Sequence, residues 1–246
     1  MPKPAIIPLL STIPLSPLPD YPAEEMASGS RSSQAWFAMG DAGPGLTVGL
    51  WAAEANETNW LDYPLHNFML VLEGELAIIT DTEEVIARAG ESVFVPQGLR
   101  CSYAQPGYSK LVVVGFLNPA EPKPSSPLRV IKIDPQVTLS QSAPPAASML
   151  LSPVPIQHTH DYFSDSTGQF TVGVWETTGY HRKLIDFPRH ELMHLLEGSV
   201  TFTDDVGQSQ IFKAGDTFFV PLGTPNAWKS EGHLRKIYCI FQPNKS

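Results

Sequence analysis

The sequence repeats itself, and this internal repeat limits the possible folds more than any other feature does. Residues 47–51 read TVGLW, and residues 171–175 read TVGVW, about 124 positions later. Further matches follow in the same order: PLH at 64–66 with PRH at 188–190, LEG at 72–74 and at 196–198, and FVPQG at 94–98 with FVPLG at 219–223. Lys110 and Lys236 each open the last apolar run of a copy. An ordered series with nearly constant spacing predicts two copies of one module.

The chain of 246 residues has room for two modules of about 120 residues, each able to bury its own core. The stretch at 118–127 is rich in proline and polar residues, which is typical of a stiff linker. We therefore predict an N-terminal module over residues 1–122 and a C-terminal module over residues 123–246. Each module opens with a Pro- and Ser-rich lead, at 1–34 and 129–157, which we expect to lie over the barrels or to cross to the other module.

Short strands separated by turn residues dominate both copies. The 24 prolines and 18 glycines disfavour helix interiors and punctuate strands and turns. The sequence predicts strands within 68–80, 92–95 and 110–116, and again within 192–203, 217–220 and 236–241. The first stretch of each copy breaks at Glu-Gly, and Asp204 to Gly207 is predicted to form a hairpin turn. Strands at about ten-residue spacing indicate an all-β jelly roll or barrel.

The motifs of both copies resemble those of the cupin superfamily. Gly215 is followed by five residues and then Pro221-Leu222-Gly223, and Gly90 by five residues and then Pro96-Gln97-Gly98. Glu191 precedes Gly198 with six residues between them. The stretches GVWE, LLEG, AGD and RKIY in the second copy, together with Trp228, are similar to the subgroup of the ureidoglycine aminohydrolase and ethanolamine-utilisation cupin domains. The resemblance implies two tandem cupin barrels, each a double-stranded β-helix.

Catalytic members of this family hold a divalent metal with three His and one Glu, so the ligand positions were compared by spacing. The second copy keeps the carboxylate as Glu191, but the third His position is Asn226. The first two His positions fall at 184 and 186 or at 185 and 187, and neither pair contains histidine. In the first copy the Glu position is Asn67 and the third His position is Cys101. We expect no metal cofactor; the alternative is manganese held weakly by Asp186, Glu191 and Asn226.

The histidines that remain are predicted to lie outside the barrel interiors. His66 and His190 occupy the same place in the two copies. Strand alternation puts His190 and His194 on the face opposite Glu191. We expect packed or interface histidines there, and surface positions for His158 and His160 in the second lead.

The mouth of the second barrel is the predicted ligand site. The residues expected to line or approach it are Tyr180, Lys183, Asp186, Glu191, Met193, Asn226, Trp228, Lys236 and Tyr238. A buried Glu191 beside Lys236 could have a perturbed pKa and transfer protons, which makes these two the candidate catalytic residues; the alternative is a structural ion pair. The first copy, with Asn67, Cys101 and Lys110 in the corresponding places, is expected to be the poorer site.

Charge and cysteine usage narrow the partners and the compartment. The formal net charge is −9 without a basic cluster, so we expect no nucleic-acid partner. No apolar run approaches the length of a membrane span and no signal peptide is evident, so we expect no membrane association. The two cysteines, Cys101 and Cys239, fall in different copies, which favours a reduced, cytoplasmic setting.

Three functions remain open from the sequence. The first is a metal-free bicupin that binds a small polar or carboxylate-bearing molecule in the C-terminal barrel, without proven catalysis. The second is a metal-dependent hydrolase similar to ureidoglycine aminohydrolase, against which the missing histidines argue. The third is a non-catalytic scaffold or assembly module, in which exposed sheet edges could support a homodimer. The first is the preferred prediction.

Overall fold

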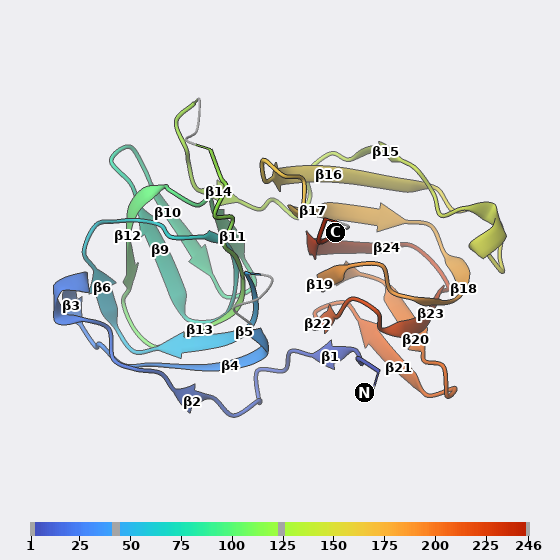
Figure 1. Ribbon diagram of the computed structural model, residues 1–246, viewed down its shortest axis with the longest axis horizontal. Helices are drawn as coiled ribbons and strands as arrows, with labels where there is room; N and C mark the ends of the chain where they lie inside the picture. The colour runs from blue at the N-terminus through green and yellow to red at the C-terminus, as the bar shows by residue number, and fades with distance from the viewer. Residues whose placement is uncertain (1–2, 41–44, 123–125, 245–246) are drawn as a thin grey trace. The chain divides into compact units, whose positions relative to one another are not determined.

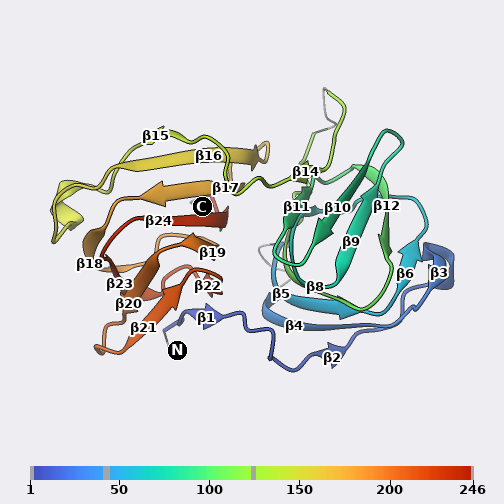
Figure 2. The ribbon, with the colours of Figure 1, turned by 180° about the vertical axis from the view of Figure 1, so that it is seen from behind.

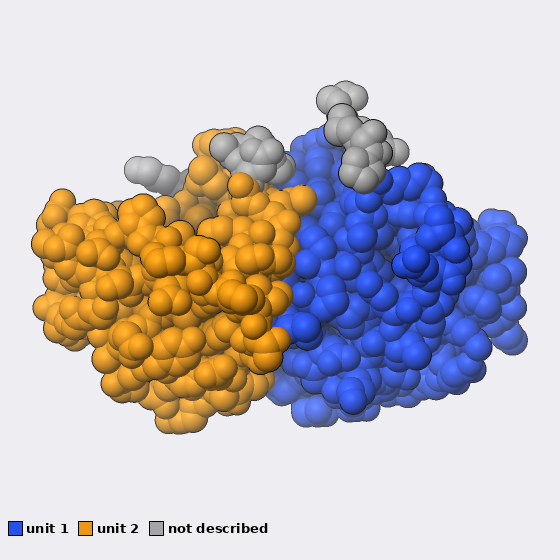
Figure 3. Space-filling view, turned by 90° about the horizontal axis from the view of Figure 1, so that it is seen from below, with its two compact units in different colours: residues 1–10, 134–246 blue, residues 11–133 orange. Residues whose placement is uncertain are grey.

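The computed structural model describes residues 3–40, 45–122 and 126–244, and its regular secondary structure consists almost entirely of β-strands (Figures 1 and 2). The chain divides into two compact units (Figure 3). Residues 11–133 form one unit, here called the N-terminal barrel. Residues 134–246, together with the N-terminal segment that ends at Leu10, form the other, the C-terminal barrel. The predicted all-β fold with two barrels is confirmed.

The N-terminal barrel contains two sheets of antiparallel strands. The larger sheet has the order β14 (Ile131–Lys132), β11 (Ser92–Val95), β8 (His66–Glu73), β13 (Ser109–Phe116), β5 (Leu46–Ala53), β4 (Ser33–Gly40), β2 (Ser16–Pro17). The smaller has the order β10 (Glu84–Arg88), β9 (Glu75–Ile79), β12 (Arg100–Gln105), β6 (Asn56–Thr58), β3 (Met26–Gly29), and β7 (Leu61–Asp62) also pairs with β12. A short 3-10 helix, η1 (Ala23–Glu25), precedes β3.

The C-terminal barrel repeats this arrangement. Its larger sheet has the order β1 (Ile7–Pro8), β22 (Thr217–Val220), β19 (His190–Glu197), β24 (Leu234–Phe241), β17 (Phe170–Thr177), β16 (Gln157–Ser164), β15 (Ser140–Ser142). Its smaller sheet has the order β18 (Tyr180–Asp186), β23 (Pro225–Ser230), β20 (Ser199–Thr203), β21 (Ser209–Lys213). The second 3-10 helix is η2 (Ala147–Met149).

The outermost strands beside β11 and β22 explain why the two units depart from the modules expected at 1–122 and 123–246. β14, from the lead of the second copy, pairs with β11. β1, from the lead of the first copy, pairs with β22. Each lead therefore completes the edge of a sheet built by the other copy. Edge pairing satisfies backbone groups that would otherwise be left open.

Matching glycines enforce the same turn in both barrels. Gly74 separates β8 from β9, and Gly198 separates β19 from β20, with φ of +77° and +78°. A Cβ at Gly198 would lie 2.2 Å from the His233 carbonyl oxygen, and at Gly74 it would lie 2.2 Å from that of Tyr108. Only glycine combines this left-handed backbone with such a close approach. The break predicted at Glu-Gly is thus confirmed in both copies.

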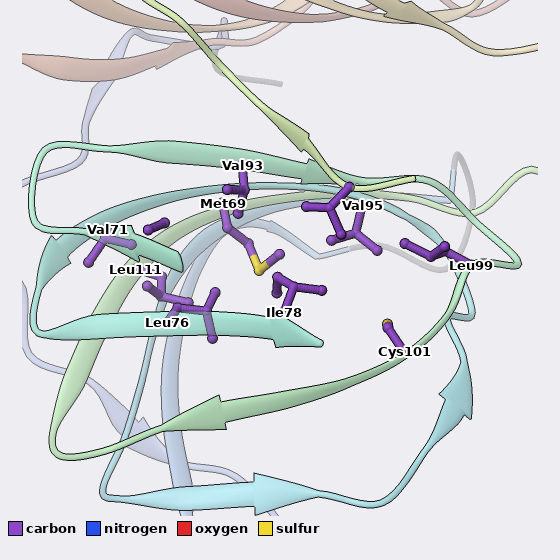
Figure 4. Close-up of a cluster of buried hydrophobic side chains, with 11 residues drawn as sticks. Met69, Val71, Leu76, Ile78, Val93, Val95, Leu99, Cys101 and Leu111 are labelled. Carbon is purple, nitrogen blue, oxygen red and sulfur yellow. The ribbon is translucent and has the colours of Figure 1, made fainter. Parts of the chain in front are cut away.

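An apolar cluster fills the inner part of each barrel. In the N-terminal barrel, side chains from both sheets meet between the layers (Figure 4); the buried members are Met69, Val71, Leu76, Ile78, Ala87, Val93, Val95, Leu99, Cys101, Leu111 and Val130. The cluster of the C-terminal barrel is more aromatic; its buried members are Tyr180, Phe187, Met193, Leu195, Val200, Phe202, Phe212, Phe218, Val220, Trp228 and Leu234. Within the described ranges, no helix is long and apolar enough to cross a membrane.

Candidate functional site

A cavity of about 590 Å³ opens in the C-terminal barrel, and five charged side chains belong to its lining. Its charged lining residues are Asp161, Arg182, Arg189, Glu191 and Lys236. Aromatic and apolar side chains supply much of the remaining wall, among them Trp175, Tyr180, Phe187, Met193, Trp228 and Tyr238. Charges inside a barrel need partners, because desolvating an unpaired charge costs several kcal/mol. Their partners therefore decide which charges in the cavity remain without a counter-charge.

Glu191, on β19, is the only buried carboxylate among these five, and two cations share it. Lys236 Nζ donates to Glu191 Oε1 at 2.6 Å, and Arg189 Nε donates to Glu191 Oε2 at 2.9 Å. Glu191 is 1% exposed and Lys236 is 5% exposed. Lys236 Nζ also lies 4.8 Å from the centre of the Trp175 ring and 3.4 Å from the Met193 sulfur. Each oxygen of the carboxylate thus accepts a hydrogen bond from one cation, and the two cations share its single negative charge.

The electrostatic balance keeps this cluster ionised at the carboxylate. Burial acts to raise the pKa of Glu191, but the charges of Arg189 and Lys236 outweigh it, and the pKa lies below its ordinary value. Burial lowers the pKa of Lys236, since Glu191 only partly compensates and Arg189 adds a like charge. A carboxylate held ionised by two cations is a weak proton acceptor. The geometry brings the candidate catalytic pair together, yet it favours anion binding over proton transfer.

Arg182, on β18, adds a third cation whose partners carry no charge. Its Nη2 donates to Asn226 Oδ1 at 2.6 Å, and its Nη1 donates to the Asn226 and Lys183 carbonyl oxygens at 3.2 and 3.1 Å. Arg182 is 6% exposed. Burial disfavours its charge and lowers its pKa, but a guanidinium remains protonated in proteins. Among the described residues, no carboxylate therefore pairs with this buried positive charge.

Tyr238 and Trp228 form the less charged walls of the cavity. The Tyr238 hydroxyl donates to Asp161 Oδ1 and lies 3.0 Å from the Thr159 hydroxyl. Trp228 stacks on Tyr180 with ring centres 5.5 Å apart, and its Nε1 donates to Ser230 Oγ at 3.2 Å. These flat faces beside a cationic floor suit a molecule with an apolar body and an anionic group.

The structure brings together seven of the nine residues expected from the sequence. Tyr180, Glu191, Met193, Trp228, Lys236 and Tyr238 line the cavity, and Asn226 binds Arg182 at its edge. Two residues do not approach it: Lys183 is exposed and donates to the Ser148 carbonyl oxygen, and Asp186 is exposed on the last position of β18. A register shift between Arg182 and Ile185 changes which side chains of β18 face inward.

The lining residues that were not predicted include Asp161, Trp175, Arg182 and Arg189. Trp175 belongs to the repeated TVGVW stretch, and Arg189 stands in the repeated Pro-x-His stretch, where the first copy has Leu65. The difference between Leu65 and Arg189 was a usable signal, because a charge replaces an apolar residue beside the Glu191 position. No comparable signal marks Arg182, since a bulge decides its direction.

The residues present do not fit the metal ion of catalytic cupins. Of the two alternatives for the first pair of ligands, the structure places Ile185 and Phe187 in the cavity wall, and neither side chain can coordinate. Both Glu191 oxygens accept from cations, and Asn226 Oδ1 accepts from Arg182. Asp186, part of the alternative manganese site, does not line the cavity. Lys236 and Arg189 supply the positive charge beside Glu191 that a metal would otherwise provide.

The matched histidines have a structural role. His190 Nδ1 accepts from the Leu222 backbone N–H at 3.1 Å, and His66 Nδ1 accepts from that of Gln97 at 3.0 Å. Each imidazole thereby fixes the Pro-x-Gly turn of its own barrel. His190 also stacks between Phe219 and Phe241, with ring centres 6.0 Å apart in both cases. The expectation that these histidines are packed outside the cavity is confirmed.

The strand registers correct one match made from the sequence. Trp175 pairs with Lys236, whereas the equivalent Trp51 pairs with Leu111. The counterpart of Lys236 is therefore Leu111, and the counterpart of Lys110 is Arg235. Lys110 Nζ donates to the Ser11 carbonyl oxygen, and Arg235 Nε donates to that of Pro135 at 2.9 Å. These two cations hydrogen-bond to the lead segments and line neither cavity. The N-terminal cavity therefore has an apolar residue where the C-terminal cavity has Lys236.

Two tandem barrels with these registers define a bicupin. The family model for the ethanolamine utilisation protein EutQ matches residues 30–122, and the family model for the EutQ-like cupin domain matches residues 164–238. The chain belongs to the cupin superfamily and is a bicupin of the EutQ type. A search of the curated proteins finds no match.

Solved structures agree on the fold over nearly the whole chain. A protein of unknown function from Pseudomonas syringae, of the DUF861 family, is 24% identical with a TM-score of 0.81, covering 97% of this chain and 100% of that one. A putative dioxygenase from Nostoc punctiforme is 11% identical with a TM-score of 0.61, covering 98% and 83%. A cupin 2 barrel protein from Leptotrichia buccalis is 12% identical with a TM-score of 0.59, covering 94% and 99%. Identities this low carry the fold and leave the activity open.

Proposed function

We propose that the C-terminal barrel binds a small carboxylate-bearing molecule without the help of a metal ion. The observation that carries this proposal is the charge of the cavity: its lining contains three cations, Arg182, Arg189 and Lys236, and only one buried carboxylate, Glu191. The second carboxylate of the lining, Asp161, is exposed. An incoming carboxylate would accept hydrogen bonds from groups that now have neutral or shared partners. Such charge-assisted bonds are the strong ones, and guanidinium binds carboxylate in a bidentate manner.

The shape of the cavity supports the same class of ligand. Its volume of about 590 Å³ lies within the range for small organic molecules. Trp175, Tyr180 and Trp228 offer flat apolar surfaces next to the cations. We therefore expect an acid with a compact apolar or aromatic body. A reduced, cytoplasmic setting is part of the proposal, because Cys101 and Cys239 are both free and buried.

Calorimetric titration of the full chain with matched acids and amides tests the proposal. Benzoate, phenylacetate and succinate are compared with benzamide, phenylacetamide and succinamide. We expect an acid of this series to bind and its amide to bind at least tenfold more weakly. Replacing Arg182→Met should weaken acid binding by tenfold or more, because one charge-assisted hydrogen bond contributes about 1.5–3 kcal/mol.

Lys183 provides the matched control on the same strand. It adjoins Arg182, carries the same charge and is exposed. Lys183→Met should leave acid binding within twofold of the unmodified protein. Equal affinity for acid and amide, the same effect in both variants, or no binding of any acid at millimolar concentration would each count against the proposal. Circular dichroism of the Arg182→Met protein separates lost binding from lost folding.

A further inference from the structure

The N-terminal barrel has a cavity of its own, of about 610 Å³, and its electrostatic character is opposite to that of the C-terminal one. Its lining, taken over the described residues, contains no lysine, arginine or histidine. The only charged lining residues there are Glu24, Glu25 and Asp62, and all three are exposed. This cavity therefore combines an uncharged interior with acidic side chains at its opening.

The three cations and the buried carboxylate of the C-terminal cavity all have uncharged counterparts here. By strand register and repeat position the counterparts are Thr58 for Arg182, Leu65 for Arg189, Asn67 for Glu191, Leu111 for Lys236 and Val113 for Tyr238. All five line the N-terminal cavity. An anionic ligand would find no positive group in such an interior, and the acidic opening would repel it.

Aromatic side chains form the walls of this cavity. Trp51, Tyr21, Tyr63 and Tyr103 all line it, and the Tyr63 and Tyr103 rings lie 5.1 Å apart. In the C-terminal barrel the Lys236 ammonium lies 4.8 Å from the centre of the Trp175 ring. At the equivalent place beside Trp51 the chain supplies Leu111, which has no charge. The N-terminal cavity thus keeps the tryptophan of the wall but lacks the cation that lies over this ring in the other copy.

An unsatisfied acceptor completes the set. Gln105 lines the cavity and is 3% exposed, and its side-chain carbonyl oxygen meets no hydrogen-bond partner among the described residues. A buried acceptor without a partner costs about 1–3 kcal/mol. A ligand that brings an N–H donor would satisfy it.

We propose that the N-terminal cavity binds an organic cation, an amine-bearing molecule with an apolar or aromatic body. Cations are attracted to the faces of Trp and Tyr rings, and most strongly where water is excluded. Glu24, Glu25 and Asp62 favour the approach of a positive charge, and Gln105 accepts from the amine. The two barrels of one chain would then bind ligands of opposite charge. This site is independent of the carboxylate site in the C-terminal barrel.

Titration of the full chain with benzylamine, benzyltrimethylammonium, benzyl alcohol and benzoate tests the inference, with tryptophan fluorescence and calorimetry as readouts. We expect at least one of the two cations to bind tenfold or more tightly than benzyl alcohol. The double variant Glu24→Gln/Glu25→Gln changes only exposed side chains; it should weaken cation binding several-fold and leave benzyl alcohol binding unchanged. A second variant, Leu111→Lys, places an ammonium beside Trp51 and should abolish cation binding.

Arg182→Met serves as the control in the other barrel. It should leave cation affinity within twofold, so that a failure of this inference and a failure of the carboxylate site are distinguishable. The inference is overturned if benzyl alcohol binds as tightly as both cations, or if neither cation binds at millimolar concentration. It is also overturned if Leu111→Lys abolishes the binding of benzoate and leaves that of the cations unchanged. It is also overturned if Arg182→Met removes cation binding. Circular dichroism shows whether the Leu111→Lys protein is folded; if it is not, the Glu24/Glu25 variant decides.

Discussion

The two barrels of this bicupin share their strand registers and differ in the chemistry of their interiors. Glu191 in one barrel holds two cations, whereas Asn67 at the same place donates to the Tyr63 hydroxyl at 2.7 Å. Sheet pairing relies on backbone hydrogen bonds, so inward side chains can change while the registers stay. The scaffold positions, such as the Gly74 and Gly198 turns, are retained in both copies. The two copies therefore keep the same backbone registers and turns, while the charged side chains of their cavities differ.

The largest expected effect comes from the carboxylate that the barrels do not share. Glu191→Gln leaves Lys236 buried without a counter-charge, which should lower the free energy of unfolding of the C-terminal barrel by about 3–5 kcal/mol. Asn67→Leu in the N-terminal barrel removes one neutral hydrogen bond and should cost about 1 kcal/mol. Hydrogen exchange of amides in β19 and β8 measures each barrel separately. Equal losses of stability in the two variants would contradict the view that Glu191 holds a buried charge and Asn67 does not.

The second effect is a pH dependence of the stability of the C-terminal barrel. Burial lowers the pKa of His194 to about 4, and Asp216 offsets this only in part; the equivalent residue in the N-terminal barrel is Leu70. Below pH 6.5 the His194 imidazole is protonated in the unfolded chain, whereas in the folded protein it stays neutral. Stability should therefore fall as pH decreases from 6.5 towards 4, by up to about 1.4 kcal/mol per pH unit.

The substitution His194→Leu copies the N-terminal barrel and should flatten this dependence. The measurement is the urea midpoint of the C-terminal barrel at several pH values, for the unmodified protein and the variant. An unchanged slope in the His194→Leu protein would show that other groups cause it. His194 Nδ1 lies 2.8 Å from the Thr217 hydroxyl, so some loss of stability at neutral pH is also expected.

The third prediction concerns what the barrels share. Gly198→Ala and Gly74→Ala each place a Cβ against a carbonyl oxygen in a left-handed turn. Each should destabilise its own barrel by about 1–3 kcal/mol, and the two costs should be similar. Thermal unfolding of both variants, with hydrogen exchange to assign the barrel, gives the comparison. A large difference would mean that the two turns are not equivalent, despite their matching φ values.

Local signals made the frame predictable. The repeat, the Glu-Gly breaks and the Pro-x-Gly turns marked the strands, and the predicted ranges 92–95 and 217–220 agree with β11 and β22. The turn from Asp204 to Gly207 lies between β20 and β21 as predicted, with Gly207 at φ +82°. Each of these signals acts within a few residues, through backbone conformation and alternation, so one sequence was enough to find them.

The site was only partly predictable, because its members meet through register. Lys110 looked like the counterpart of Lys236, since both open an apolar run, but the pairing partners of Trp51 and Trp175 show a shift of one residue. Along a strand, one residue moves a side chain to the opposite face. The bulge after Arg182 had the same consequence for β18, where Arg182 faces the cavity and Lys183 does not.

The sequence by itself determined that this chain holds two copies of an all-β module and that the imidazoles of a metal site are replaced in both. Only the tertiary structure decided that Arg189 and Lys236 share Glu191, that Arg182 lines the same cavity, and that β1 and β14 complete the sheets. The physical reason is distance along the chain. Turn and strand preferences are set by neighbours, whereas the charge of a cavity is set by side chains that come together only when remote strands pair.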